Sequence, residues 1–154
     1  MKKIAFLFAG LLIGAALSAQ ADFSGSWKLN NSKSKLGEQF SMAPKEIKIV
    51  QNGNDLSVER HLAFQDQEFT TNDKFTLDGK ECINTAFQDN QKKSVCAWSD
   101  DKSSLKITTK FQMGDNGEMT LVETYKLDGG NLVIQSNSSS SFGEMAETQV
   151  FDKE

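Results

Sequence analysis

The chain has 154 residues, 17 Lys and Arg against 21 Asp and Glu, and a formal net charge of −4 at pH 7. An acidic chain with a single arginine is a poor candidate for nucleic acid, whose affinity comes largely from neutralised phosphates. One histidine and two cysteines, with no ligand spacing around them, predict neither a structural metal nor a cofactor.

The N-terminus has the pattern of a targeting segment. Two lysines precede an apolar run over residues 4–17, and Ala19-Gln20-Ala21 fits the small-x-small pattern of a cleavage site. The run is too short to span a bilayer comfortably. We therefore expect a signal peptide over 1–21, cleaved after Ala21, and a bacterial protein that is periplasmic or secreted.

Removal of the segment takes away two lysines and no acidic residue, so the net charge falls from −4 to −6. The remaining 22–154 has the length of a single domain with a real core. Nothing in it is long and apolar enough for stable membrane insertion, and it lacks the basic amphipathic stretch of a membrane-surface protein.

Strand signals then recur roughly every ten residues, separated by turn residues, and helical periodicity is nearly absent. The expected strands are 25–30, 45–51, 55–64, 68–79, 80–87, 93–99, 104–113, 118–127, 131–139 and 146–151. The polar connection 30–44 is expected to hold at most one short helix, near 33–38. Asn52-Gly53-Asn54 is a strong hairpin signal.

Consecutive antiparallel strands leave two exposed edges unless the sheet closes on itself. Closure gives an all-β, up-and-down antiparallel β-barrel of 8–10 strands. A two-sheet sandwich is the alternative, but short consecutive hairpins argue against the crossovers that it needs.

The two cysteines predict a disulfide, because the chain is expected to be exported. Cys82 and Cys96 each lie seven residues from Asp89, so a hairpin turning there would place them opposite one another. Directly opposed residues are about 4.5–5.5 Å apart at Cα, within reach of a disulfide. Polar Asn84 and Ser94 share their face, which predicts a bridge on the outer wall.

Both ends of the predicted domain resemble the calycin superfamily. The opening Phe23-x-Gly25-x-Trp27-x-Leu29 is similar to the first strand of lipocalins and intracellular fatty-acid-binding proteins, and 125–153 looks like the last three strands of the latter. The resemblance implies a ten-stranded barrel around a cavity, with Trp27 as a structural residue that seals one end. The size and apolar character of Trp27 independently predict a core position.

Two departures from the resemblance matter. The segment 31–44 is too short for the helix-turn-helix lid of fatty-acid-binding proteins. The final strand lacks their Arg-x-Tyr, and no arginine follows Arg60, so their anion site cannot be transferred. The chain therefore resembles an exported bacterial lipocalin-like family more than either well-known branch.

Alternation along the strands places several polar residues on inward, apolar faces. They are Arg60, Asp73, Thr109, Glu123 and Tyr125. An unpaired buried charge costs several kcal/mol, so these groups should be paired or hydrated. Arg60 is expected either to anchor an acidic head group, with Tyr125 donating a hydrogen bond, or to pair internally with Glu123 or Asp73. A bulge that turns Arg60 to solvent is a third option.

The candidate ligand-binding residues are Arg60, Tyr125, Glu123, Asp73, Phe64, Phe75 and Phe111. They favour a binding protein that sequesters a small hydrophobic or amphipathic molecule in a barrel cavity. An alternative is an envelope protein-interaction or inhibitor module, with a self-filled barrel and contacts made by loops such as 31–44 and 114–117.

A weaker alternative is an enzyme that uses Arg60, Glu123 and Tyr125 as acid–base groups. The lone histidine, His61, has outward parity, and no motif supplies a nucleophile and an orienting acid for it. We therefore expect a protein that is not an enzyme and has no catalytic residues.

Overall fold

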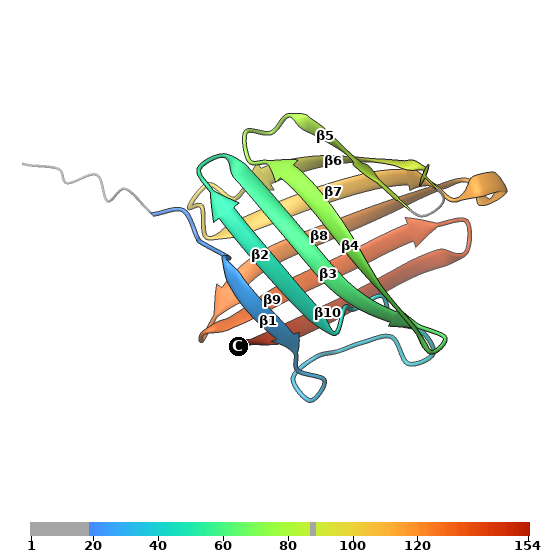
Figure 1. The fold of residues 1–154 in the computed structure, drawn as a ribbon, viewed down its shortest axis with the longest axis horizontal. Coiled ribbons are helices and arrows are strands. Elements are labelled where there is room, and N and C mark those ends of the chain that lie inside the picture. Colours follow the sequence, from blue (N-terminus) through green and yellow to red (C-terminus); the bar gives the residue numbers. More distant parts are fainter. Residues whose placement is uncertain (1–18, 87–88) are drawn as a thin grey trace, which may run out of the picture.

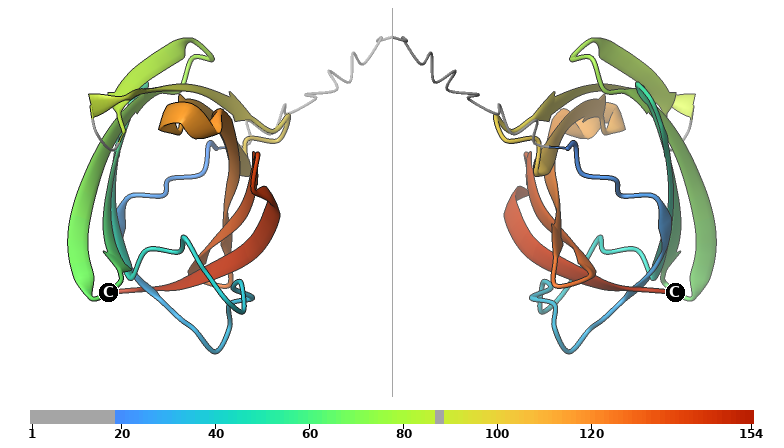
Figure 2. Two further views of the ribbon diagram at one scale, coloured as in Figure 1. Left: turned by 90° about the vertical axis from the view of Figure 1, so that its right-hand side faces the viewer. Right: turned by 90° about the vertical axis from the view of Figure 1, so that its left-hand side faces the viewer.

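The computed structural model describes residues 19–86 and 89–154, and within them ten strands form one antiparallel sheet (Figure 1). The strands are β1 (Gly25–Leu29), β2 (Glu46–Asn52), β3 (Asp55–Phe64), β4 (Gln67–Thr76), β5 (Glu81–Thr85), β6 (Gln91–Trp98), β7 (Ser104–Gln112), β8 (Glu118–Asp128), β9 (Asn131–Ser140) and β10 (Gly143–Lys153). The sheet curls into a nearly closed barrel, which is seen end-on in Figure 2. The predicted all-β, up-and-down barrel is thereby confirmed.

Most of the predicted signal peptide, residues 1–18, lies outside the described residues. In the part of the chain that is described, no helix has the length and apolar character needed to cross a membrane.

Closure occurs where the first and last strands meet. The strand order is β4-β3-β2-β1-β10-β9-β8-β7-β6-β5, and β1 pairs with β10 through Trp27↔Lys153 and Leu29↔Phe151. All other neighbouring strands of the sheet are consecutive in the chain. The two edges of the sheet, β4 and β5, therefore face each other across a single seam.

Hydrogen bonds from side chains connect β4 and β5 across this seam, where no backbone ladder is formed. The Asn84 side chain accepts a hydrogen bond from the Lys74 backbone N–H at 2.8 Å and donates one to the Lys74 carbonyl at 2.9 Å. The Thr76 backbone N–H donates to Cys82 Sγ at 3.1 Å. An amide side chain has the same donor and acceptor as a peptide group, so Asn84 replaces one ladder pair.

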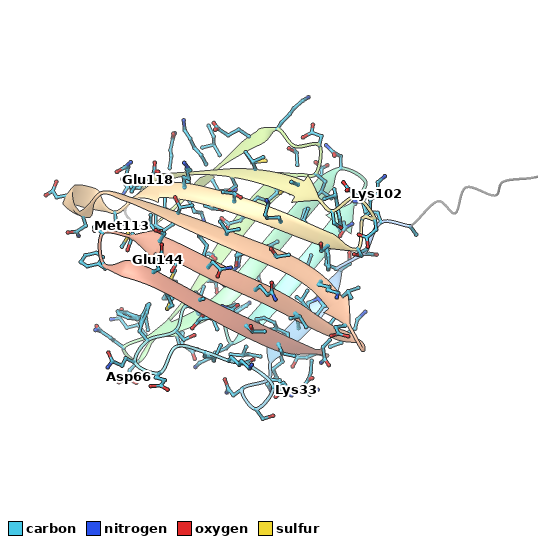
Figure 3. The ribbon with its side chains drawn as sticks, turned by 180° about the vertical axis from the view of Figure 1, so that it is seen from behind. Lys33, Asp66, Lys102, Met113, Glu118 and Glu144 are labelled. Atoms are coloured by element: carbon cyan, nitrogen blue, oxygen red, sulfur yellow. The ribbon has the colours of Figure 1, made fainter. Side chains whose placement is uncertain are left out.

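Apolar side chains fill the half of the barrel where the N-terminal segment enters. The core there consists of Phe23, Trp27, Ile47, Ile49, Leu56, Val58, Phe75, Leu77, Cys96, Leu105, Ile107, Tyr125, Leu132, Ile134 and Phe151. We call this end the closed end. Lys102 marks it in Figure 3, whereas Asp66, Met113 and Glu144 mark the opposite end.

Phe23, just before β1, acts as a plug in the closed end. Its side chain is fully buried, stacks on Trp98 with ring centroids 5.9 Å apart, and meets Tyr125 edge-on at 6.0 Å. Trp27 Nε1 donates a hydrogen bond to the Phe23 carbonyl at 2.9 Å. The structure therefore places Trp27 in the closed-end core. Phe23, which precedes β1, packs in the same core.

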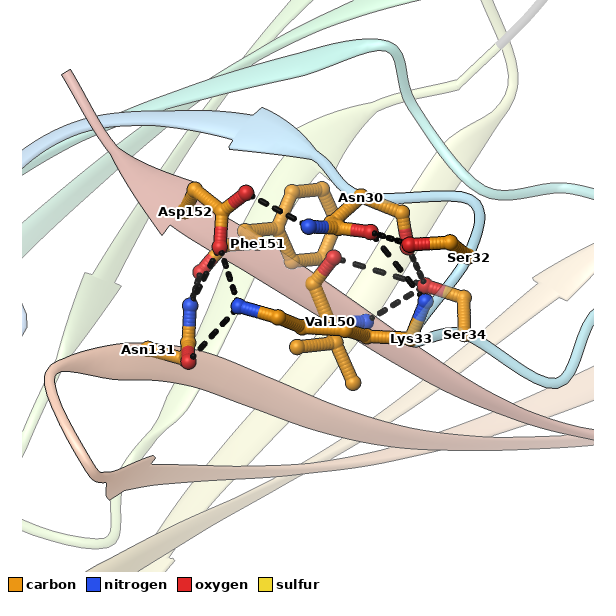
Figure 4. Close-up of polar contacts among 8 residues, drawn as sticks. All are labelled: Asn30, Ser32, Lys33, Ser34, Asn131, Val150, Phe151 and Asp152. Atoms are coloured by element: carbon orange, nitrogen blue, oxygen red, sulfur yellow. Dashed lines mark hydrogen bonds and ion pairs between the residues drawn. The ribbon is translucent and has the colours of Figure 1, made fainter.

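Residues 30–45, which we call the strap, connect β1 to β2 without forming a helix. Asp152 holds the start of the strap: it accepts hydrogen bonds from Asn30 Nδ2 at 2.6 Å, Lys33 Nζ at 2.9 Å and Asn131 Nδ2 at 2.6 Å (Figure 4). The hydrogen bond from Lys33 is the largest of the effects that lower the pKa of Asp152. A bridge between Lys35 and Thr148 then continues the pairing along β10 beyond the end of β1.

The predicted cysteine pairing is wrong in both register and face. Cys82 pairs with Ser94, and both cysteines are free thiols. The hairpin pairs Thr85 with Gln91, so it is centred one residue before Asp89, and the partner of Cys82 moves by two positions.

The face of this hairpin is also opposite to the prediction. Cys96 and Ser94 are buried inside the barrel, whereas Ile83 and Val95 are exposed on the outer wall. Ser94 tolerates burial because its hydroxyl is hydrogen-bonded to that of Thr109 at 2.8 Å.

Candidate binding site

An ion-pair network crosses the barrel interior at Arg60. The Arg60 side chain starts from the middle of β3, where its backbone is in regular register with Ile47 and Thr71. Its Nη1 donates to Asp73 Oδ2 of neighbouring β4 at 2.9 Å, and its Nη2 donates to Glu123 Oε2 of β8, also at 2.9 Å. Because β3 and β8 are five places apart in a ring of ten strands, this second contact spans the interior.

Two further side chains complete the network. Arg60 Nη2 also donates to the Tyr125 hydroxyl at 2.7 Å, and Lys92 Nζ of β6 lies 2.6 Å from Asp73 Oδ1. Asp73 is therefore held between two cations, one from each side of the seam. We call Arg60, Asp73, Lys92, Glu123 and Tyr125 the arginine network.

Burial and charge act in opposite directions on the Arg60 guanidinium. Burial alone would lower the pKa of Arg60, but Glu123, Tyr125 and Asp73 together raise it above its ordinary range. Burial raises the pKa of Tyr125, and the nearby Arg60 offsets only part of that shift. Near neutral pH the guanidinium is therefore charged and the phenol is protonated.

This geometry tests two of the three expectations for Arg60. The regular register rules out a bulge at residue 60, and the side chain pairs internally with both Glu123 and Asp73. A ligand-anchoring role of Arg60 stays a prediction. The sequence pattern identified every member of the network except Lys92.

The inward side chains become more exposed toward the end of the barrel opposite the plug. Along β3 the exposed fraction rises from 1% at Val58 to 49% at Phe64, and along β4 from 4% at Phe75 to 48% at Phe69. The Phe40 ring of the strap meets Phe64 edge-on at 5.8 Å. The end with the β3–β4 turn is thus the more exposed end of the barrel, and we call this half the open half. The arginine network lies at the boundary between the filled half and the open half.

The three aromatic residues predicted to line a ligand site do not lie together. Phe75 belongs to the closed-end core, Phe64 stands at the rim of the open end, and Phe111 is half-buried on β7. Only Phe64 and Phe111 are placed where a ligand in the open half could reach them.

Beyond the network, the open half has a polar wall on β9 and β10. Ser136 and Ser138 are buried on the inner face of β9. Glu147 Oε1 accepts a hydrogen bond from the Gly37 N–H of the strap at 2.9 Å, and Glu147 Oε2 accepts one from Gln149 Nε2 at 3.0 Å. We call Ser136, Ser138, Glu147 and Gln149 the polar wall.

Two open grooves lie on the outside of the molecule. The larger, about 610 Å³, runs over the outer face of β6 and β7 between Glu81 and Glu118. The smaller, about 430 Å³, lies at the seam beside Cys82.

His61 has the outward position expected from its parity. Its Nε2 lies 2.8 Å from Glu59 Oε1 on the outer wall, away from the arginine network. Within residues 19–86 and 89–154, no three His, Cys, Asp or Glu side chains are grouped so as to hold a metal ion.

The ten strands, the β1–β10 closure and the seam between β4 and β5 define the barrel fold of the fatty-acid- and bile-acid-binding proteins. Zebrafish ileal bile acid-binding protein complexed with cholic acid is similar to this chain with a TM-score of 0.58 and 20% identity, over 86% of this chain and 98% of that one. Apo lipid binding protein 8 of Caenorhabditis elegans has a TM-score of 0.58 and 16% identity, over 86% and 95%. At these identities the likeness shows the fold alone.

No family model matches the chain, and no curated protein matches it significantly.

Proposed function

We propose that the protein is an exported binding protein for a small amphipathic molecule, which enters at the open end and lies above the arginine network. The observation that carries this proposal is the gradient of exposure along β3 and β4, from a sealed apolar end to an accessible one. The names of the two similar structures, a bile acid-binding protein and a lipid binding protein, support the same class of ligand. Export is supported by the targeting pattern of residues 1–21.

The lining of the open half has the mixed character that an amphipathic ligand needs. Half-buried apolar side chains such as Leu62, Phe111 and Leu121 provide contact area for a hydrocarbon body. The arginine network and the polar wall face the same space and provide polar partners. Sequestration in such a site needs no covalent chemistry.

Acid–base catalysis by the arginine network is disfavoured. Glu123, Tyr125 and Arg60 are in contact, as the enzyme alternative requires. However, efficient general acids and bases have pKa values near the working pH, and the pKa values of Arg60 and Tyr125 are both raised away from neutrality.

Binding can be tested with a fluorescent neutral probe, N-phenyl-1-naphthylamine, and a matched pair of tryptophan variants of chain 22–154. Leu62 points inward on β3, and Ala63, the next residue, is exposed on the outer wall. Leu62→Trp should fill part of the open half and weaken probe binding at least tenfold, whereas Ala63→Trp should leave it unchanged. Equal effects of the two variants, or no probe binding by the unmodified chain, would overturn the proposal.

One observation favours the alternative of a protein-interaction module: two open grooves, one over β6 and β7 and one beside Cys82 at the seam, lie on the outer surface of the molecule. The same experiment separates the two functions. A self-filled interaction module would bind no probe, and native mass spectrometry of protein from its own host would show no added small mass.

A further inference from the structure

We infer that the open half selects an uncharged head group that bears hydroxyls over an anionic one; this inference rests on the proposed function. The first step is that the interior cations of the open half are already paired. Arg60 contacts Asp73 and Glu123 at 2.9 Å, and Lys92 contacts Asp73 at 2.6 Å. A carboxylate ligand would have to displace one of these protein carboxylates from a largely buried pair, and breaking such a pair is costly.

The second step concerns the balance of charge. The arginine network and the polar wall together hold three carboxylates, Asp73, Glu123 and Glu147, and two cations, Arg60 and Lys92. Glu147 is bonded to the Gly37 N–H and the Gln149 amide, and neither of these brings a positive charge. The formal excess is therefore negative, and it repels an incoming anion.

The third step concerns the inward hydroxyls of β9. Ser136 and Ser138 are 5% and 9% exposed, and a serine hydroxyl can both donate and accept a hydrogen bond. Ser136 is paired in register with Glu123, and Ser138 with Leu121, so the serines stand beside the network on the same wall.

Together these features form a site for a head group that can both donate and accept hydrogen bonds and that carries no negative charge. The two serine hydroxyls can donate or accept a hydrogen bond. The carboxylate oxygens of the arginine network have lone pairs that Arg60 and Lys92 do not use, and these can accept a hydrogen bond from a ligand hydroxyl. The glycerol of a monoacylglycerol has this chemistry, and the apolar rim around Phe64 and Leu62 would contact its acyl chain.

The test uses three ligands with the same twelve-carbon chain, 1-monododecanoylglycerol, dodecanoate and dodecylamine, in competition with N-phenyl-1-naphthylamine at pH 7.4. The glycerol ester should displace the probe at a concentration at least tenfold lower than dodecanoate. Dodecylamine, whose positive charge the excess of carboxylates attracts, should also bind more tightly than dodecanoate. Binding of dodecanoate as tight as, or tighter than, that of the glycerol ester would overturn the inference and leave the proposed function intact. Failure of all three to displace a bound probe would overturn the inference, and failure of the probe itself to bind would overturn both.

Two variants test the mechanism directly. Glu123→Gln removes one carboxylate from Arg60 and should raise dodecanoate affinity at least tenfold, with little change for the glycerol ester. Ser138→Ala should weaken the glycerol ester about fivefold and leave dodecanoate unchanged. Ser139→Ala, at the next and exposed position of β9, is the matched control and should change neither. An equal loss in Ser138→Ala and Ser139→Ala would contradict a role for the inner hydroxyl.

Discussion

Glu123 of β8 accepts a hydrogen bond at 2.9 Å from the Arg60 guanidinium of β3, and this contact joins opposite walls of the barrel. Hairpin hydrogen bonds connect only neighbouring strands, and strand number and stagger set the width of a barrel. The buried charged contact adds a link between two strands that are not neighbours. The arginine network is therefore both a brace across the barrel and the floor of the open half.

Arg60→Met should lower the free energy of unfolding. The substitution leaves Asp73 and Glu123 facing each other with only Lys92 nearby, and removing one partner of a buried ion pair costs about 3–5 kcal/mol. Urea unfolding at pH 7 measures this cost.

The cost of Arg60→Met is compared with that of removing an exposed ion pair. Lys45→Met is the control, because Lys45 and Glu68 form an exposed pair, and its removal should cost less than about 1 kcal/mol. Equal costs for the two variants would show that the network is not a buried brace.

Much of the site could be read from the alternation of side chains. The period of a strand is two, so residues such as Arg60 and Glu123 could be placed inward without knowing which strands face each other. Their contact could not be read from the sequence, because it depends on closure placing β3 opposite β8. Ring closure was expected from the edge argument, but its register was not.

The missed residues have two other causes. Lys92 lies one residue before the predicted strand 93–99, although β6 begins at Gln91. Phe23 lies before β1 in the structure as well, so the alternation of a strand could not place it. The cysteine pairing failed because a shift of one residue in a hairpin centre moves every partner by two.

Asn84→Ala should loosen the seam without unfolding the barrel. The variant removes both hydrogen bonds to the Lys74 backbone, and these bonds are partly solvated, so the free energy of unfolding should fall by only about 1 kcal/mol. Hydrogen exchange at the Lys74 amide should accelerate at least tenfold, because its acceptor is lost. Asn137→Ala, on the exposed face of β9 with a strand on each side, should leave exchange in β4 unchanged. Unaltered exchange at Lys74 in Asn84→Ala would mean that the seam is held by other contacts.

Cys96 should make the fold less stable in mildly alkaline solution. Burial raises the pKa of the Cys96 thiol to about 12, whereas an unfolded chain has thiols that titrate near about 8.5. Above that value the unfolded state loses the proton first, so the free energy of unfolding should fall by up to about 1 kcal/mol between pH 8 and 9.5.

Urea unfolding at several pH values in this window, with Cys96→Ala for comparison, checks the sign of the effect. The variant should lack most of the slope, and thiol titration of the denatured wild-type protein should count two free thiols. A count of zero would show that Cys82 and Cys96 become linked in solution, and the alkaline slope of Cys96 would then be absent.

Phe23→Ala should open the closed end and destabilise the whole barrel. The ring is fully buried between Trp98 and Tyr125, and truncating a buried phenylalanine costs about 3–5 kcal/mol. Urea unfolding gives the loss, and a red shift of tryptophan fluorescence should accompany it, because Trp27 and Trp98 both lie beside the plug. Phe142→Ala is the control: that ring is 73% exposed, and its removal should change stability by less than about 0.5 kcal/mol.

A shortened chain tests the same residue in a second way. Phe23 would be the second residue after cleavage at Ala21, so a chain that begins at Ser24 lacks it. This chain should lose as much stability as Phe23→Ala. A loss below about 1 kcal/mol in both would mean that the plug is dispensable and that β1 alone seals this end.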